Sequence, residues 1–388
     1  MYRPHPGDSD LRFLATAARG TEAIVAAELA ELGVESPRVV PGGVRFVGAL
    51  PLAMRLCLWS RTANRILVLI GRDRVDHDNQ LYPAVRSMNW LDWVTPKTTV
   101  AVHAHTRGMV LRNSHFVTLK VKDAVVDAVR DKHGIRPNVD RIDPAIEVTV
   151  YARNGELDVL IALQGKPLNQ RGYRAAEVDA PLKETLAACL LRYADWQRPR
   201  PLHDVTCGSG TVAIEAAWMA MDRAPGIGRR FAFQRWNHVF PGALESLWRG
   251  CTDEADERVR DGIGGVIMAS DIDRNAVRAT RTNLAAAGVK GVTVREADAR
   301  NLERLPGEGA FVFNPPYGER IGDDIVTLHD EIGTALARCA GNTATVITVP
   351  EGVEGLTDGF GLEPERSEVV FNGPLRCEFA HFEVPAAE

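Results

Sequence analysis

The segment Asn314-Pro315-Pro316-Tyr317 combines residue types that suit recognition of a planar ring bearing an amino group. It follows an apolar run at 309–313 that predicts a short buried strand. The side-chain carbonyl of Asn314 and the backbone carbonyl of Pro315 are two acceptors, and Pro316 has no N–H to compete with them. Two converging acceptors suit an exocyclic –NH2 group, and Tyr317 supplies a flat face for stacking. Holding both hydrogens would orient the nitrogen toward an electrophile. The structural alternative is a proline-rich strand end.

A glycine-rich turn follows another predicted strand, at 202–207. Gly208 and Gly210 allow the backbone to turn tightly and approach a ligand, and the helix expected after them offers free N–H groups. The polar and small neighbours that complete this candidate binding loop are Asp204, Cys207, Ser209 and Thr211. The glycine spacing also fits a dinucleotide fingerprint, and a plain strand–helix turn is the structural alternative.

Two more carboxylates follow predicted strands. Asp271 can accept hydrogen bonds from both hydroxyl groups of a ribose. Asp273 is assigned instead to capping the helix that follows it. Asp298 lies after a strand at 291–296 and can accept from an adenine amino group, although a solvated loop carboxylate fits the sequence about as well.

The elements that position these residues alternate between short apolar strands and helices from about residue 170. The predicted strands are 202–207, 264–270, 291–296, 309–314 and 343–349, and the helices are 211–221, 274–287 and about 325–340. This order predicts a doubly wound, parallel α/β sheet. A basic, aromatic insertion occupies 222–263, and two adjoining strands at the tail predict an antiparallel hairpin.

The front of the chain predicts two smaller α/β modules. Residues 11–70 alternate strand, helix, strand, helix, strand. Residues 80–165 predict a helix at 81–93, a half-buried strand at 98–106, and an amphipathic helix that ends at Gly134. Two strands follow, joined by the turn Asn154-Gly155, which is a strong hairpin signal.

Charge is distributed unevenly along the 388 residues. Residues 1–169 hold 22 Lys and Arg against 18 Asp and Glu, whereas the remainder holds 24 against 33. Within 97–136 there are eight basic residues against three acidic ones. The basic front half indicates an anionic partner such as nucleic acid, with a solvated charged face as the equal alternative.

Other classes of protein find no support in the sequence. No apolar run approaches a membrane span, and the N-terminus lacks a signal-peptide core. The six cysteines are scattered without metal-ligand spacing, so we expect no zinc site and no disulfide framework. These features predict a cytoplasmic protein without a metal.

The motifs together resemble those of class I S-adenosylmethionine-dependent amino-methyltransferases. These are Asp-x-x-Cys-Gly-Ser-Gly-Thr at 204–211, an acid ending the second strand, Ala-Asp-Ala at 297–299 and Asn-Pro-Pro-Tyr at 314–317. Residues 111–140 resemble a THUMP RNA-binding domain, and 168–191 resemble the linker of guanine-N2 RNA methyltransferases, as do NPPYGERIG and RRFAFQRW. The chain is most similar to the bacterial 23S rRNA guanine-N2 methyltransferase group. One departure is Val205, where that family has proline.

The resemblance implies three domains and a set of roles. The domains are a ferredoxin-like α/β domain at 1–75, a THUMP domain at 76–166 and a Rossmann-like methyltransferase domain at 167–388. The implied cofactor is S-adenosylmethionine, held by Asp204, Cys207, Gly208, Ser209, Gly210, Thr211, Asp271, Asp298 and Asn314. Asn314, Pro315 and Tyr317 would hold the guanine. The candidates for phosphate contact are Arg107, Lys120, Lys122, Arg130 and Lys132.

Several alternatives stay open. A tRNA guanine-N2 methyltransferase would have the same order of modules. An N6-adenine or protein glutamine methyltransferase shares the Asn-Pro-Pro-Tyr motif but leaves residues 80–165 unexplained. A non-catalytic RNA-binding protein would not need the acceptors at 314–317, and a dinucleotide oxidoreductase explains the glycines alone.

Overall fold

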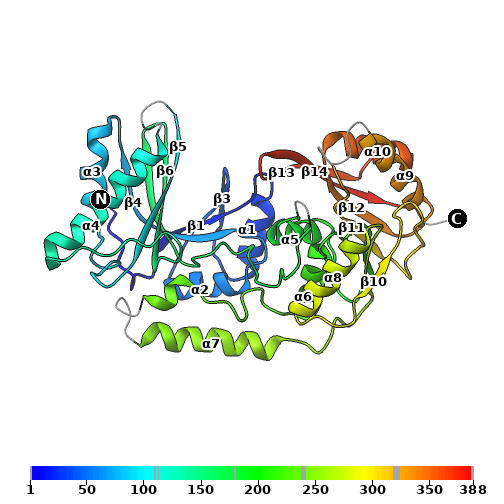
Figure 1. Cartoon of the computed structure of the whole chain (residues 1–388), viewed down its shortest axis with the longest axis horizontal. Helices are drawn as coiled ribbons and strands as arrows, with labels where there is room; N and C mark the ends of the chain where they lie inside the picture. The colour runs from blue at the N-terminus through cyan, green and yellow to red at the C-terminus, as the bar shows by residue number, and fades with distance from the viewer. Residues whose placement is uncertain are drawn as a thin grey trace. The chain divides into compact units, whose positions relative to one another are not determined.

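A computed structural model of the chain describes residues 2–108, 111, 113–178, 181–236, 242–317 and 324–385. The chain forms two compact units (Figure 1). The first comprises Met1–Thr16, Ala26–Leu168 and Gly228–Asp253, and the second comprises Ala17–Val25, Asn169–Ile227 and Glu254–Glu388. Within the described residues, no helix is both long and apolar enough to cross a membrane.

One seven-stranded sheet runs through the first unit. Its strands, in the order β2-β3-β1-β4-β7-β6-β5, are Arg38–Val40, Gly43–Gly48, Leu11–Thr16, Arg65–Arg74, Glu156–Ala162, Ile146–Arg153 and Val100–Arg107. The associated helices are α1 (Glu22–Glu31), α2 (Leu50–Trp59), α3 (Asp78–Arg86) and α4 (Ser114–His133). The predicted Asn154-Gly155 hairpin is confirmed, because both residues have positive φ and join β6 to β7.

The two front modules predicted at 1–75 and 76–166 share that sheet. Strands β4 and β7 pair antiparallel from Leu67 with Ala162 to Arg74 with Glu156, with an irregularity between Leu69 and Gly71. The proposed boundary near residue 75 therefore falls between strands of one sheet. The helix predicted at 81–93 is wrong at its end, since α3 stops at Arg86 and Ser87 caps it.

Part of the insertion packs into the first unit. Trp236 donates from Nε1 to the carbonyl of Ala145 at 2.8 Å, and its ring meets Trp93 edge-on. Arg235 forms an ion pair with Asp143. The insertion also contains a helix that the sequence did not predict, α7 (Ala243–Arg258), preceded by a short 3-10 helix at Ala232–Arg235. The predicted insertion residues 237–241 lie outside the described residues.

The second unit contains the doubly wound sheet. Its strands, in the order β10-β9-β8-β11-β12-β14-β13, are Thr293–Glu296, Ile267–Asp271, Leu202–Asp204, Ala310–Phe313, Thr343–Thr348, Leu375–Glu383 and Arg366–Asn372. The first five are parallel, and the predicted tail hairpin β13–β14 joins β12 antiparallel. The order reverses between β8 and β11, where ligands bind in sheets of this kind.

Helices cover both faces of this sheet. Helices α5 (Glu184–Tyr193), α6 (Thr211–Ala220) and α8 (Arg274–Ala286) lie on one side, and α9 (Ile325–Ala337) and α10 (Pro350–Phe360) lie on the other (Figure 1). Strand β11 is buried on both sides for this reason: Val312 belongs to the core with α5 and α6, while Phe311 and Phe313 belong to the core with α9 and α10. An uninterrupted apolar run is the pattern such a strand requires.

Two buried histidines predict a loss of stability in mild acid. Burial lowers the pKa of both His203 and His381 to about 4. The unfolded value is about 6.5, so the stabilisation is complete above that pH and is lost as pH falls toward 4. For each histidine, we expect the free energy of unfolding to be about 2 kcal/mol smaller at pH 5 than at pH 7, as measured by urea titration.

A pair of substitutions tests this origin. His381 shares a hydrogen bond with Thr345. His381→Asn should reduce the pH dependence, because asparagine takes up no proton when the chain unfolds in acid. His115→Asn, at an exposed position, should leave the pH dependence unchanged. An equal drop in all three proteins would show that other groups are responsible.

Candidate functional site

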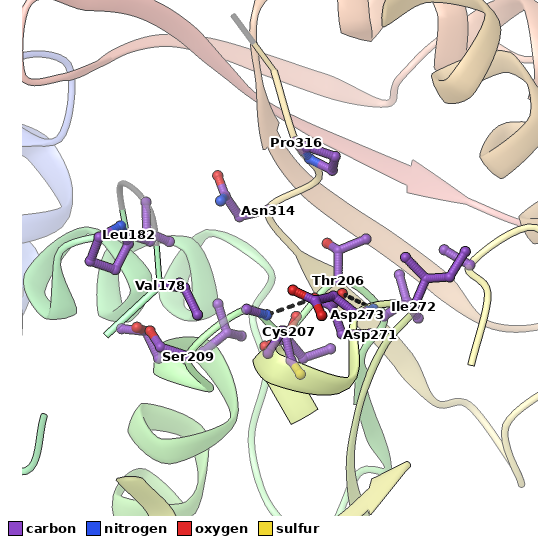
Figure 2. A pocket seen from close by; sticks show the side chains of 18 of the residues that line it. Val178, Leu182, Thr206, Cys207, Ser209, Asp271, Ile272, Asp273, Asn314 and Pro316 are labelled. Carbon is purple, nitrogen blue, oxygen red and sulfur yellow. Dashed lines mark hydrogen bonds between the residues drawn. The ribbon is translucent and has the colours of Figure 1, made fainter. Parts of the chain in front are cut away.

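A pocket of about 710 Å³ lies at the carboxyl ends of β8, β9, β10 and β11, at the point where the strand order reverses. This volume is typical of a small-molecule site, for which the range is about 300–1,000 Å³. Figure 2 shows Asn314 and Pro316 toward one end of the pocket and Cys207, Ser209 and Asp271 toward the other. The structure thus brings together residues from all four motifs found in the sequence.

The glycine turn forms the bend between β8 and α6. Gly208 and Gly210 have φ values of +53° and +83°, in the left-handed region that favours glycine. The N–H of Gly210 donates to the carbonyl of Cys207 at 2.7 Å, which closes the turn directly before Thr211 begins the helix. Cys207, Gly208, Ser209 and Thr211 all line the pocket, as predicted for a ligand-binding loop.

Gly210→Ala should disrupt this turn. A Cβ at Gly210 would lie 2.8 Å from the Thr280 methyl group, in addition to the strain of a positive φ. We expect a loss of at least about 1 kcal/mol in the free energy of unfolding and weaker cofactor binding. The control is Gly288→Ala, which has a similar φ of +67° but meets no atom within 4 Å. Equal losses in the two variants would assign the effect to backbone strain alone.

Asp204 places a buried carboxylate beside the turn. The residue is 1% exposed, no side chain donates to its oxygens in the described part of the chain, and the backbone N–H groups of Thr206 and Ala213 offset its burial only in part. Burial, with the nearby charge of Asp271, raises the pKa of Asp204 well above its ordinary value. A buried charge without a partner is costly, so this carboxylate suits a ligand that brings a cation or several donors.

Asp271 is held by backbone groups. Its Oδ2 accepts from the N–H of Gly208 at 2.9 Å, and its Oδ1 accepts from the N–H of Asp273 at 3.0 Å (Figure 2). Each oxygen retains a lone pair for a ribose hydroxyl. Asp273 caps α8 through a bond from the N–H of Asn275, which confirms its assignment as a helix cap.

Asp298 lines the pocket with a partner that the sequence did not suggest. Arg300 donates to its carboxylate from Nε at 3.0 Å and from Nη2 at 2.7 Å. The hydrogen bond from Arg300 lowers the pKa of Asp298 below its ordinary value. Arg300 also lines the pocket. Asp298 is therefore ionised and oriented, and an adenine amine would share it with this guanidinium.

The residues of the Asn-Pro-Pro-Tyr motif are placed differently from one another. Asn314 and Pro316 line the pocket, and Asn314 Oδ1 is buried without a hydrogen-bond partner among the described residues. Pro315 is buried. Tyr317 is partly buried, and its hydroxyl accepts from Asn372 Nδ2 at 3.2 Å. The rest of NPPYGERIG, at 318–322, lies outside the described residues.

Arg174 is a functional candidate that sequence reasoning missed. Its guanidinium donates to Ser209 Oγ at 2.8 Å and to Thr211 Oγ1 at 3.3 Å, and it forms an ion pair with Glu184. It thereby ties the 171–174 segment to the glycine turn. The sequence offered only the arginines of Arg-Gly-Tyr-Arg, without a sign of which one reaches the turn. Arg171 pairs with the buried Glu215 instead.

The candidate phosphate contacts lie in the first unit. Arg107 ends β5, and Lys120 and Lys132 are exposed on α4. Lys122 forms an ion pair with Asp123, and Arg130 pairs with both Asp127 and Asp131. Arg107, Lys120 and Lys132 are therefore freer to meet an anion than the other two.

Comparison with known families assigns each part of the chain. A family described as "RMKL-like, methyltransferase domain" matches residues 171–381, more than half of the chain. The chain belongs to the RMKL-like methyltransferase family. An "RlmL ferredoxin-like domain" matches residues 12–67, and a THUMP domain matches residues 76–161. The predicted fold class, with these three modules and a class I methyltransferase sheet, is confirmed.

Curated relatives of this family member carry one name. Proteins named "Ribosomal RNA large subunit methyltransferase K/L" are 35% identical over 384 residues in Pseudomonas paraeruginosa and 36% identical over 377 residues in a Shewanella species. Each match covers 95% of this chain and 52% of the relative. The chain therefore spans about half the length of the curated relatives it matches.

Solved structures share the fold along nearly the whole chain. A protein described as a methyltransferase, solved in complex with SAH, is 28% identical with a TM-score of 0.88, covering 98% of this chain and 100% of that one. A protein from Listeria monocytogenes described as an N6-adenine-specific DNA methylase is 27% identical with a TM-score of 0.85, covering 97% of each chain. The two descriptions differ in substrate although the folds agree.

Proposed function

We propose that this chain methylates the exocyclic N2 amine of a guanine in 23S rRNA, using S-adenosylmethionine. The observation that carries the proposal is Asn314 Oδ1, a buried acceptor with no partner among the described residues, on a residue that lines the same pocket as the glycine turn. A buried acceptor without a partner requires a donor, and an exocyclic amine supplies one.

The pocket fits S-adenosylmethionine. Asp204 would meet the cationic amino group of its methionine portion, since this carboxylate is buried and no cationic side chain among the described residues lies beside it. Asp271 would hold the ribose and Asp298 the adenine amine, with the turn Cys207–Thr211 beneath the methionine portion. When bound, the cofactor supplies an electrophilic sulfonium methyl group.

The chain's own residues would position the amine. Asn314 Oδ1 and the carbonyl of Pro315 accept its two hydrogens, which directs the nitrogen lone pair toward the methyl group. Tyr317 stacks on the guanine ring. No general base is assigned, because the methylated ammonium is strongly acidic and loses its proton to water. Positioning, rather than acid–base chemistry, is the contribution of this site.

The RNA substrate is proposed from the front modules. A THUMP match and a basic segment suit RNA, and the relatives at 35–36% identity are named for large-subunit ribosomal RNA. A guanine in folded RNA would be flipped into the pocket. Ribosomal RNA as substrate places the activity in the cytoplasm.

The test is transfer of labelled methyl from S-adenosylmethionine to unmodified bulk RNA, which is fractionated into rRNA and tRNA and digested to nucleosides. We expect N2-methylguanosine in the large rRNA. The same nucleoside in tRNA would keep the chemistry and change the substrate. Methyl on adenine or cytosine would show that guanine is not the methylated base. No transfer to any RNA despite cofactor binding would contradict the proposal as a whole.

A further inference from the structure

A second pocket, of about 380 Å³, lies in the first unit on the sheet β3-β1-β4-β7. Strand register places its side chains on one face: Arg12 is opposite Val47 and Leu14 is opposite Arg45, while Leu69 is opposite Leu160. On the other face of the sheet Phe13 stacks on Phe46, and both are buried. We call this second pocket the sheet-face groove.

The sheet-face groove combines an apolar floor with a cationic rim. Leu14, Leu69 and Leu160 are buried or partly buried in a small apolar cluster of the sheet. The charged residues of its lining are Arg12, Arg38, Arg45 and Arg72 against Glu35 and Asp158. The groove therefore has four cations and two anions, and the excess of positive charge attracts an anion.

The four arginines fall into two pairs. Asp158 accepts from Arg72 Nη2 at 2.9 Å and from Arg45 Nη2 at 3.2 Å, so one carboxylate orients two guanidinium groups. The hydrogen bond that Arg72 donates to Asp158 raises the pKa of Arg72, which keeps it charged. Arg12 and Arg38 are exposed and form no ion pair with any residue in the described part of the chain. The Arg12 guanidinium lies over the Tyr2 ring, 4.6 Å from its centroid. Both arginines therefore carry a charge that no carboxylate of the described residues neutralises, and Arg38 is the freer of the two.

An apolar floor beside free guanidinium groups suits a planar ring that carries a phosphate. Guanidinium groups bind phosphate in bidentate fashion and stack on nucleobases. Proteins that bind single-stranded RNA stack its bases on aromatic rings or on the planes of arginine guanidinium groups, and this groove offers the latter. A carboxylate peptide would use the cations but leave the apolar floor without a matching group.

We infer that the sheet-face groove binds an unpaired nucleotide of the substrate RNA, with the base on Leu14, Leu69 and Leu160 and the phosphate at Arg12 and Arg38. This inference rests on the proposed function, because it adds a contact for the same RNA in a separate part of the protein. Binding at this groove would hold one part of the RNA in place while the target guanine enters the pocket that Asn314 lines.

The test uses the full chain and a fluorescently labelled, mixed-sequence single-stranded RNA, with affinity measured by anisotropy across a salt series. Arg38→Gln should weaken binding by roughly 5- to 10-fold and reduce the salt dependence by about 0.7 in the log–log slope, the loss of one phosphate contact. Glu35→Gln, which removes an anion from the same groove, should tighten binding by about 2- to 5-fold. A loss of folding would weaken RNA binding in both variants. Weaker binding by Arg38→Gln and tighter binding by Glu35→Gln would therefore show an effect of charge.

Two controls complete the design. Arg278→Gln changes an exposed arginine of α8 outside both pockets and should leave RNA affinity unchanged. Ultraviolet cross-linking of RNA containing 4-thiouridine should label peptides that contain residues 12–14 or 35–47. Unchanged affinity in both groove variants, or cross-links confined to other peptides, would overturn the inference and leave an acidic protein partner as the occupant.

The two proposals can fail separately. If the wild-type chain methylates RNA while the groove variants bind RNA normally, only the groove assignment is wrong. If the wild-type chain methylates no RNA, the proposed function is wrong whatever the groove variants do.

Discussion

Asn314→Ala should reduce kcat for methyl transfer to RNA by 10²- to 10³-fold while changing the dissociation constant for S-adenosylmethionine by less than about threefold. The magnitude is that of removing one preorganised polar group from a catalytic site. The reason is geometric: Oδ1 is buried without a partner among the described residues, so its proposed role is to orient the amine rather than to support the strand. Single-turnover kinetics with saturating RNA and a separate calorimetric titration with cofactor would measure the two effects.

Two further variants separate this role from a loss of structure. Asn314→Asp keeps an oxygen acceptor at the same place and should retain more activity than the alanine variant. Asn301→Ala, at an exposed loop position after β10, should leave kcat unchanged. If Asn314→Ala weakened cofactor binding as much as it slowed transfer, the side chain would belong to the cofactor site alone.

The parts of the site predicted from sequence share one property: each is fixed by a local pattern at a strand end. Gly208 and Gly210 need positive φ, and Asp271 follows an apolar run directly. Because the carboxyl ends of parallel strands meet at one edge, correct strands were enough to bring these residues together. The strand pattern also predicted the tail hairpin, since β13 and β14 are joined by a short turn.

The parts that sequence reasoning missed depend on long-range side-chain contacts. Arg174 reaches Ser209 and Thr211, some 35 residues away, and nothing in Arg-Gly-Tyr-Arg distinguishes it from Arg171. Arg300 is a local exception: it lies two residues from Asp298, and it was missed because the sequence does not show which way a loop side chain turns. For Arg174, tertiary packing selects one of two equally charged candidates.

The single sheet shared by the two front modules was also not predicted from the sequence. It depends on the pairing of β4 with β7, strands separated by about 90 residues, and no local sequence pattern indicates that pairing. The helix α10 was not predicted, and its three glycines at 352, 355 and 359 are poor helix formers. In the structure those positions approach α9 closely: a Cβ at Gly359 would lie 2.0 Å from the carbonyl of Asp330.

Asp204→Asn should have opposite effects on stability and on binding. We expect the ligand-free protein to melt several degrees higher, because the substitution removes a buried carboxylate that no side chain of the described residues neutralises. We expect S-adenosylmethionine to bind about 10- to 100-fold more weakly, because a hydrogen bond to a charged group is worth about 1.5–3 kcal/mol. Thermal unfolding without ligand and a calorimetric titration would give the two values.

The pH dependence of this effect has a definite sign. Burial raises the pKa of the Asp204 carboxyl in the folded protein above its unfolded value of about 3.9. Its contribution to stability is therefore complete below pH 3.9 and is lost as pH rises through the folded pKa. The melting temperature of the asparagine variant should accordingly exceed that of the wild type by more at pH 8 than at pH 4.

Asp253→Asn provides the matched control, since it makes the same substitution at an exposed position of α7, outside the pocket. Because this side chain lies in solvent, neither stability nor cofactor affinity should change appreciably. A parallel fall of stability and affinity in Asp204→Asn would mean that the carboxylate supports the fold. Opposite changes would mean that the folded protein retains a destabilising charge because the ligand requires it, which connects the burial of Asp204 directly to function.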